Sequence, residues 1–203
     1  SDGGGSNGGG TFSNNDAGSV SNSGGVTGAL AADGVSFAYP APRVGSCGVH
    51  GTRHDGTLKS VSLHPAPGSS TALLGSSGSG KSTLVRILLA LAQPSAGTVA
   101  LGAREVKPGP ARSLRWYRQA VQYIPQNPAG SLDPRMSVAQ LLREPLRQLR
   151  VEGNHRSLVA DALERVELPA GLMESRPGEL SGGQNQRVAI ARAMAVRPAY
   201  LLA

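Results

Sequence analysis

The sequence predicts an α/β fold, with a parallel-sheet core, an antiparallel β subdomain before it and a helical insertion near residues 113–175. Three patterns favour this fold. Short segments of strand length fill the first half of the folded region, a glycine-rich loop joins one of them to an amphipathic helix, and the second half is mostly helical. Strands that alternate with helices are typical of proteins with a buried parallel sheet.

The start of the chain has the composition of a linker. Residues 1–28 are mostly Gly, Ser and Asn, with Phe12 as the only aromatic residue. Such a segment buries too little apolar area to offset the entropy lost on ordering. We therefore expect a flexible linker over residues 1–28, which allows another domain to precede it, and one folded domain over residues 29–203.

Four segments have the patterns of β-strands. Residues 34–39 and 58–63 alternate between apolar and small or polar types, which predicts two half-buried strands. The residues between them, 41–57, are rich in Gly, Pro and polar types and predict an inserted loop. The largely apolar residues 70–74 predict a buried parallel strand, and residues 98–101 predict a further strand.

A helix is predicted over residues 82–92, and Pro94 ends it. Its apolar face recurs at i, i+3, i+4 and i+7, at Leu84, Ile87, Leu88 and Leu91.

Three further helices are expected beyond residue 113. Residues 138–149 predict a helix that Pro145 kinks or splits, and residues 157–166 predict another. A helix is also expected from Ser181 to about residue 196, after which residues 199–203 begin an apolar strand. The second half of the folded region is therefore expected to contain more helix than strand.

The chain is basic, with a net charge of +7 and a pI near 10.3, which favours anionic partners or a solvated basic surface. Only two Phe, four Tyr and one Trp can stack on bases, so we expect no nucleic acid partner. Cys47 is the single cysteine and excludes an internal disulfide. No apolar stretch reaches the roughly 18 residues that span a bilayer, so we expect any membrane association to depend on a partner protein.

Residues 75–83 read Gly-Ser-Ser-Gly-Ser-Gly-Lys-Ser-Thr and match the phosphate-binding loop, or P-loop. Glycines let successive N–H groups face an anion, and the positive end of the following helix adds to the attraction. Lys81 can reach the β- and γ-phosphates, Ser82 can ligate Mg²⁺, and Thr83 can help to hold the α- or β-phosphate. The expected phosphate-binding set is Gly75, Ser76, Ser77, Gly78, Ser79, Gly80, Lys81, Ser82 and Thr83.

Residues 180–184, Leu-Ser-Gly-Gly-Gln, resemble the signature of the ABC ATPases, the nucleotide-driven engines of ABC transporters. In that family the signature opens a helix whose N-terminus faces the γ-phosphate held by the other subunit. The resemblance therefore implies nucleotide contacts for Ser181, Gly182, Gly183 and Gln184. Alone, the motif also fits a glycine turn capped by serine at a helix start. Asn185 departs from the Arg or Lys common next in the family, and we expect this departure to matter little.

Residues 121–126, Val-Gln-Tyr-Ile-Pro-Gln, resemble the Q-loop of the same family. The resemblance implies that Gln126 contacts Mg²⁺ and the attacking water and couples the site to a membrane subunit. An ordinary polar residue that leaves a strand is the alternative. Tyr39 resembles the aromatic residue that stacks on adenine, although it lies further from the P-loop than usual, and a simple strand-end tyrosine remains open. Catalytic roles are thus implied for Lys81 and Gln126.

Residues 126–138 and 143–146 are similar to the ATPases of oligopeptide, dipeptide and nickel importers, and the family resemblance covers residues 29–203. It implies binding and hydrolysis of ATP with Mg²⁺, which would drive solute uptake. The implied partners are a second ABC ATPase domain, identical or different, membrane permease subunits and an extracytoplasmic solute-binding protein. The implied location is peripheral, at the cytoplasmic face of the cell membrane.

The chain ends at Ala203, where the family next places a magnesium-binding Asp, a catalytic Glu and, further on, a His. Glu174 and Glu179 precede the signature helix and cannot replace them. We therefore expect a C-terminally incomplete fold and little or no hydrolysis by this chain alone. Two alternatives stay open: a catalytically dead nucleotide-binding module, and a soluble ABC ATPase that acts on ribosomes or DNA. Residues 113–175 disfavour the second, because they contain neither long heptads nor a basic run.

A cluster of Cys47, His50, His54 and Asp55 lies in the 41–57 insertion. Its spacing matches no standard zinc pattern, so we expect a solvated loop there. His64 and His155 are expected to be structural or surface residues.

Overall fold

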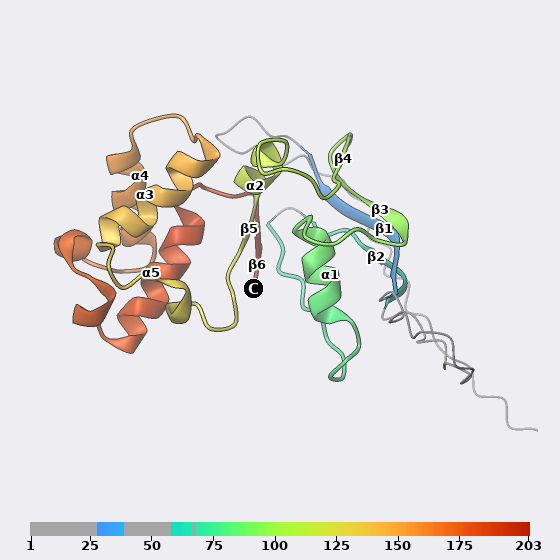
Figure 1. Cartoon of the computed structure of the whole chain (residues 1–203), viewed down its shortest axis with the longest axis horizontal. Coiled ribbons are helices and arrows are strands. Elements are labelled where there is room, and N and C mark those ends of the chain that lie inside the picture. The colour runs from blue at the N-terminus through green and yellow to red at the C-terminus, as the bar shows by residue number, and fades with distance from the viewer. Residues whose placement is uncertain (1–27, 39–57, 67) are drawn as a thin grey trace, which may run out of the picture.

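The strand and helix patterns fold into an α/β architecture with two lobes, as seen in a computed structural model that describes residues 28–38, 58–66 and 68–203 (Figure 1). The sheet lobe contains β1 (Leu30–Phe37), β2 (Leu58–Leu63), α1 (Lys81–Leu88), β3 (Ala96–Leu101), β4 (Arg104–Glu105), α2 (Arg115–Ala120), β5 (Val121–Tyr123) and β6 (Tyr200–Leu202). The helical lobe contains η1 (Ala129–Ser131), α3 (Val138–Leu149), α4 (His155–Arg165), η2 (Ala170–Glu174), η3 (Pro177–Glu179) and α5 (Gly182–Met194).

An antiparallel sheet in the order β2-β1-β3-β4 forms one side of the molecule. Apolar residues pair across it, with Val35 opposite Val61 and Ala32 opposite Val99. Gly97 lies where β1 and β3 approach closely, since a Cβ there would lie 2.4 Å from the carbonyl oxygen of Asp33. The sheet was expected before the P-loop only, but β3 and β4 follow α1 in sequence, so segments on both sides of the P-loop build it.

The strand predicted over residues 70–74 is wrong. These residues form no strand and are exposed, and Leu74 retains 92% of its accessible surface. A short apolar run becomes a strand only where a neighbouring strand can pair with it. In the described part of the chain, the ladders involve β1 to β4 and the β5–β6 pair, and none includes this run.

Helix α1 is shorter than the predicted 82–92 helix. It ends at Leu88, and Ala90 has a left-handed backbone with φ of 53°. Three residues of the predicted apolar face are buried, but Leu91 lies beyond the helix and is 57% exposed. The periodic pattern therefore extends one turn further than the backbone hydrogen bonds do.

A parallel pair of strands, β5 and β6, lies on the side of the sheet lobe that faces the helical lobe in Figure 1. Val121 is opposite Tyr200, and Tyr123 is opposite Leu202. The expectation of an apolar strand near residues 199–203 is therefore confirmed, and the structure shows that it pairs in parallel with β5. The predicted helical region, 113–175, contains β5 in addition to its helices.

The helical lobe follows its sequence pattern closely. Helix α3 has the predicted bounds and keeps Pro145 in its interior. Ser137 and Gln140 form a capping box at its start, while Asn154 caps α4 by accepting bonds from two backbone N–H groups. Each lobe has its own core, one around Val35, Ile87 and Tyr117, the other around α3, α4 and α5.

Candidate functional site

Lys81 organises the glycine-rich loop at the start of α1. Its Nζ donates hydrogen bonds to the carbonyl oxygens of Gly75 (2.6 Å) and Ser76 (2.7 Å) and to the hydroxyl of Ser79 (3.1 Å). The ammonium group is thus held inside the curve of the loop. Because the loop is exposed, an anion can reach this charge and replace the weak neutral acceptors around it.

Three glycines give the loop its shape. A Cβ on Gly75 would lie 2.6 Å from the Ser79 hydroxyl, so a larger residue would force the loop to shift. Gly78 has φ of 82°, a conformation that favours glycine, although space is open around it. Gly80 also has a positive φ, of 89°, and caps α1 without any side-chain bond to the helix. The loop therefore offers the helix N-terminus to a ligand instead of capping it internally.

The two hydroxyl residues after Lys81 differ in environment. Ser82 is exposed in the first turn of α1, whereas Thr83 is 5% exposed. An exposed hydroxyl beside an ammonium group and an uncapped helix end suits a cation that is itself bound to phosphate oxygens. The residues present therefore fit a nucleotide phosphate with Mg²⁺, with Ser82 as the candidate protein ligand of the metal.

The signature residues open α5 in the helical lobe. The Ser181 hydroxyl accepts from the backbone N–H of Gln184 (3.2 Å), and Gln184 Oε1 accepts from the backbone N–H of Ser181 (2.9 Å). These two bonds form a capping box at the start of α5. The motif is therefore a serine-capped helix start, as its alternative interpretation expects. Ser181, Gly182 and Gly183 are nevertheless exposed.

Within the part of the chain that the structure describes, nothing requires glycine at positions 182 and 183. Neither has a positive φ, and an added Cβ would meet nothing within 4 Å at either position. Glycine in a helix costs up to about 1 kcal/mol relative to alanine. The two glycines therefore make the start of α5 less stable than alanines would. They also leave room for a group from outside the chain to approach the backbone closely.

The P-loop and the signature do not meet in one molecule. In Figure 1, α1 and α5 lie on opposite sides of the β5–β6 pair. A ligand on the P-loop would therefore need a second molecule to bring a signature to it.

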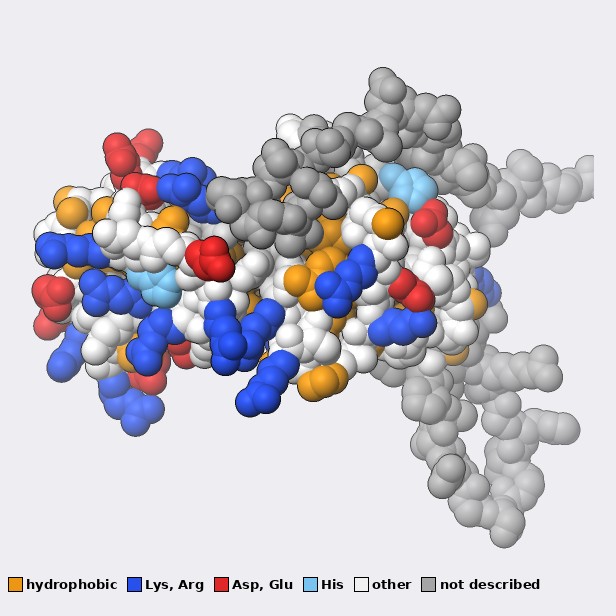
Figure 2. All heavy atoms as spheres, turned by 90° about the horizontal axis from the view of Figure 1, so that it is seen from above, with side chains coloured by type: hydrophobic (Ala, Val, Ile, Leu, Met, Phe, Trp, Pro, Cys, Tyr) orange, Lys and Arg blue, Asp and Glu red, His pale blue; other side chains and the backbone are white. Residues whose placement is uncertain are grey.

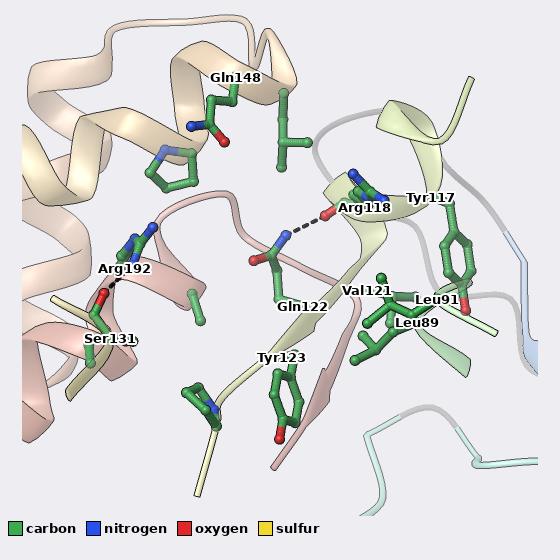
Figure 3. Close-up of a pocket in the computed structure, with 15 residues that line it drawn as sticks. Leu89, Leu91, Tyr117, Arg118, Val121, Gln122, Tyr123, Ser131, Gln148 and Arg192 are labelled. Atoms are coloured by element: carbon green, nitrogen blue, oxygen red, sulfur yellow. Dashed lines mark hydrogen bonds between the residues drawn. The ribbon is translucent and has the colours of Figure 1, made fainter. Parts of the chain in front are cut away.

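Gln126 is exposed and follows β5, in the segment that joins the two lobes. A cleft of about 390 Å³ lies next to this segment (Figure 3). Tyr117 and Arg118 come from the sheet lobe, and Gln148 and Arg192 come from the helical lobe. The complete lining is Leu89, Leu91, Tyr117, Arg118, Val121, Gln122, Tyr123, Pro125, Ser131, Pro145, Gln148, Leu149, Ala189, Arg192 and Ala193.

Arg192 joins three parts of the helical lobe at this cleft. From α5, its guanidinium donates to the carbonyl oxygen of Ser131 (3.2 Å) and to Glu144 on α3 (3.1 Å). The other carboxylate oxygen of Glu144 accepts from the side chain of Gln148. Arg192 therefore ties the segment after Gln126 to the helix that the signature opens. No sequence pattern signals this role, because the partners lie 61 and 48 residues away.

Arginines dominate the charge beside the cleft. Residues 112–156 contain eight arginines and three acidic residues. Asp133 is bound to Arg135, whose backbone N–H and then side chain hold the pKa of that carboxyl below its usual range. In Figure 2, basic and acidic side chains are interspersed over the helical lobe, where every basic residue shown in blue is an arginine. This excess of arginine is local to residues 112–156, because residues 157–203 contain five arginines and five acidic residues.

Some predicted features lie outside the described residues, namely the linker up to residue 27, the 41–57 insertion with its Cys47, His50, His54 and Asp55 cluster, and Tyr39. His64 and His155 are described: His64 lies 2.7 Å from the Asp33 carboxylate at the surface, and His155 bonds to the carbonyl oxygen of Val151. Among the helices within residues 28–38, 58–66 and 68–203, none has the length and apolar character to span a bilayer.

Comparison with known families gives one clear match. The sequence model described as ABC transporter matches residues 58–203, which is more than half of the chain. The nickel import ATP-binding protein NikE of Shigella boydii is 37% identical over 152 residues, or 74% of this chain and 57% of that protein. A relative from Brucella ovis, named for ATP binding and peptide import, is 38% identical over 148 residues, or 72% of this chain and 47% of that protein. The chain thus spans about half the length of these relatives.

Solved structures show the same architecture. The dimeric post-hydrolysis structure of the ATP-binding cassette MJ0796, bound to ADP and Pi, has a TM-score of 0.65 and 27% identity, covering 83% of this chain and 70% of that one. The structure of cbiO1 from Clostridium perfringens, part of an ABC transporter complex, has a TM-score of 0.65 at 23% identity, covering 85% and 63%. The P-loop NTPase fold expected from the sequence is therefore confirmed.

Proposed function

Because this chain belongs to the ABC transporter family, we propose that it is an ATP-binding part of an importer and takes up Mg·ATP on residues 75–83. The geometry of Lys81 carries this proposal. Its ammonium group is held by neutral oxygens inside an exposed loop at an uncapped helix end. The phosphate oxygens of ATP are stronger acceptors for the same donors.

The roles of the other site residues follow from this placement. Lys81 neutralises charge on the β- and γ-phosphates, and the backbone N–H groups of the loop hold the remaining oxygens. Ser82 supplies a hydroxyl ligand for Mg²⁺, which offsets the phosphate charge when bound. Gln126, at the junction of the lobes, orients the attacking water and senses movement of the helical lobe. Tyr39 contributes an aromatic face for adenine.

We propose that two such domains sandwich the nucleotide, with the P-loop of each facing the signature of the other. The glycines at 182 and 183, which no contact among the described residues requires, support this arrangement, as does the separation of α1 from α5. The dimeric cassette structure with ADP and Pi is similar to this chain in fold. A permease in the membrane and an extracytoplasmic solute-binding protein would complete the importer.

Peptides or nickel are the proposed cargo. The support is the similarity to relatives named for nickel import and for peptide import. Attachment to a permease would place the domain at the cytoplasmic face of the membrane. The cleft beside Gln126 is a suitable contact for that partner, because both lobes line it.

Association driven by ATP tests the proposal. Sedimentation of the chain with Mg·ATP should reveal a dimer that is absent without nucleotide. Gly183→Leu should prevent the dimer because its side chain blocks the close approach, and it should leave the monomer folded because open space surrounds the site. Gly171→Leu, at another glycine with open space around it, is the matched control and should dimerise normally.

The rival interpretation, a catalytically dead nucleotide-binding module, is separated by phosphate release. Dimerisation with steady release of phosphate supports the ATPase. Dimerisation without release is expected under both interpretations, because we expect little or no hydrolysis by this chain alone. Failure of the wild-type chain to bind Mg·ATP at all would contradict both interpretations.

A further inference from the structure

Asn185 fastens the turn before the signature to the helix that the signature opens. Its side-chain Nδ2 donates to the carbonyl oxygen of Pro177 (2.9 Å) and lies 3.5 Å from the carbonyl oxygen of Leu180. These two carbonyls belong to η3 and the residue after it, immediately before Ser181. One amide group therefore bridges the two sides of the exposed signature.

The chemistry of the contact requires a donor. Both partners are carbonyl oxygens, which only accept hydrogen bonds. With the amide in the opposite orientation, two oxygen atoms would face each other, so the Nδ2 of Asn185 must be the atom that points to Pro177. Its Oδ1 is buried and has no hydrogen-bond partner in the described part of the chain. The site therefore keeps the donor contact although it leaves an acceptor unsatisfied, which is an unusual state for a buried group.

The rest of the turn is held by its own bonds. Glu179 accepts from the backbone N–H of Arg176, and the backbone N–H of Leu180 donates to the carbonyl oxygen of Pro177. These contacts shape the turn but do not attach it to α5. Among the side-chain hydrogen bonds of this turn within the described residues, those of Asn185 make that attachment.

We propose that Asn185 is a positioning residue that fixes where Ser181 and Gly182 are presented to a nucleotide on the partner domain. This inference rests on the proposed ATP-driven dimer. A turn already held in place loses less conformational freedom when the two domains dock, so association is stronger than with a loose turn. Nucleotide binding to the P-loop, on the other lobe, does not depend on the contact.

Asn185→Asp is the most direct test, because it keeps the shape of the side chain and removes the donor. Its carboxylate faces two carbonyl oxygens, so we expect ATP-driven association of the full chain to weaken by about tenfold or more. Mg·ATP binding by the monomer should stay within about twofold of wild type. Gln186→Glu makes the same chemical change at the next, exposed position and should leave both measurements unchanged.

A pH profile separates positioning from simple destabilisation. Nearby acceptors disfavour the charged form of the new carboxyl, so its pKa should rise. As the pH falls, the protonated carboxyl of the variant can donate to Pro177 again, and association of Asn185→Asp should recover towards the wild-type value. Gln186→Glu should show no such recovery.

The outcomes are distinguishable from failure of the proposed function. If the wild-type chain does not associate with Mg·ATP, the proposed dimer fails, and this inference fails with it. If the wild type associates and folded Asn185→Asp associates equally well, only the inference is overturned. If Asn185→Asp does not fold, Asn185→Leu, which lacks the donor and carries no charge, replaces it under the same criteria.

Discussion

The hydroxyl oxygen of Tyr200 accepts a hydrogen bond of 3.0 Å from the backbone N–H of Leu30, 170 residues earlier in the chain. Leu30 begins the antiparallel sheet, and Tyr200 begins β6 of the parallel pair. Both residues are buried. One side-chain contact therefore joins the two sheets of the sheet lobe at its interior.

Tyr200→Phe should destabilise the chain by about 1–3 kcal/mol, because it leaves the N–H of Leu30 buried without an acceptor. Urea unfolding followed by circular dichroism measures the change. Tyr123→Phe is the control, since Tyr123 is 41% exposed, and it should shift the free energy of unfolding by less than about 0.5 kcal/mol. Equal effects from the two variants would contradict the structural role of the Leu30 contact.

Gly75→Ala should lower the affinity for Mg·ATP at least about tenfold, because its Cβ collides with Ser79 and displaces the acceptors of Lys81. Titration with a fluorescent ATP analogue measures this affinity. Gly171→Ala adds the same methyl group where space is open and should bind normally. Unchanged binding by Gly75→Ala would show that the loop shape described above is not needed for the ligand.

Tyr117 should make the fold sensitive to alkali. Burial raises the pKa of its hydroxyl far above the usual value, and the hydroxyl donates to the carbonyl oxygen of Leu88. The unfolded chain ionises this group near pH 10, whereas the folded chain keeps it protonated. Its contribution to stability is therefore complete below about pH 10 and is lost as the pH rises further.

Tyr117→Phe tests whether stability falls with rising pH because of this hydroxyl. Above about pH 10, the free energy of unfolding should fall less steeply for the variant than for the wild type. Absorbance of tyrosinate should also show one group that ionises only on unfolding in the wild type. A parallel loss of stability in both proteins would contradict the burial argument.

Arg192→Ala should destabilise the helical lobe by about 1–2 kcal/mol, because it breaks bonds to Ser131 and Glu144 in a site that is only partly exposed. The stability of Arg192→Lys should lie between those of the alanine variant and the wild type. A single ammonium group cannot donate to both partners with the geometry of the planar guanidinium. Thermal unfolding measures the series. Arg165→Ala, at an exposed position on α4, should have little effect.

The helical lobe was the most predictable part of the fold. Helix α3 has the predicted bounds because its apolar period coincides with the capping box of Ser137 and Gln140. The strand predicted over residues 70–74 was wrong because three consecutive apolar residues do not show whether a neighbouring strand will pair with them. Leu91 continued the helical period, but the left-handed Ala90 ended the helix before it.

The candidate site was predictable where local spacing defines the chemistry. The P-loop needs its glycines, Lys81 and Ser82 in a continuous stretch, so the sequence contains the whole pattern. Arg192 was missed because its partners come from distant segments that only the tertiary structure brings together. For Asn185 a signal existed, namely its departure from the family pattern, but its meaning depended on the carbonyl groups that face it.

Equilibrium binding of Mg·ATP to the full chain tests the central claim most directly. We expect saturable binding at one site per chain, lost or weakened at least about tenfold in Lys81→Ala. Lys107→Ala, which removes an exposed lysine paired with Glu105, is the matched control and should bind like the wild type. Absence of binding, or equal binding by wild type and Lys81→Ala, would contradict a nucleotide site on residues 75–83.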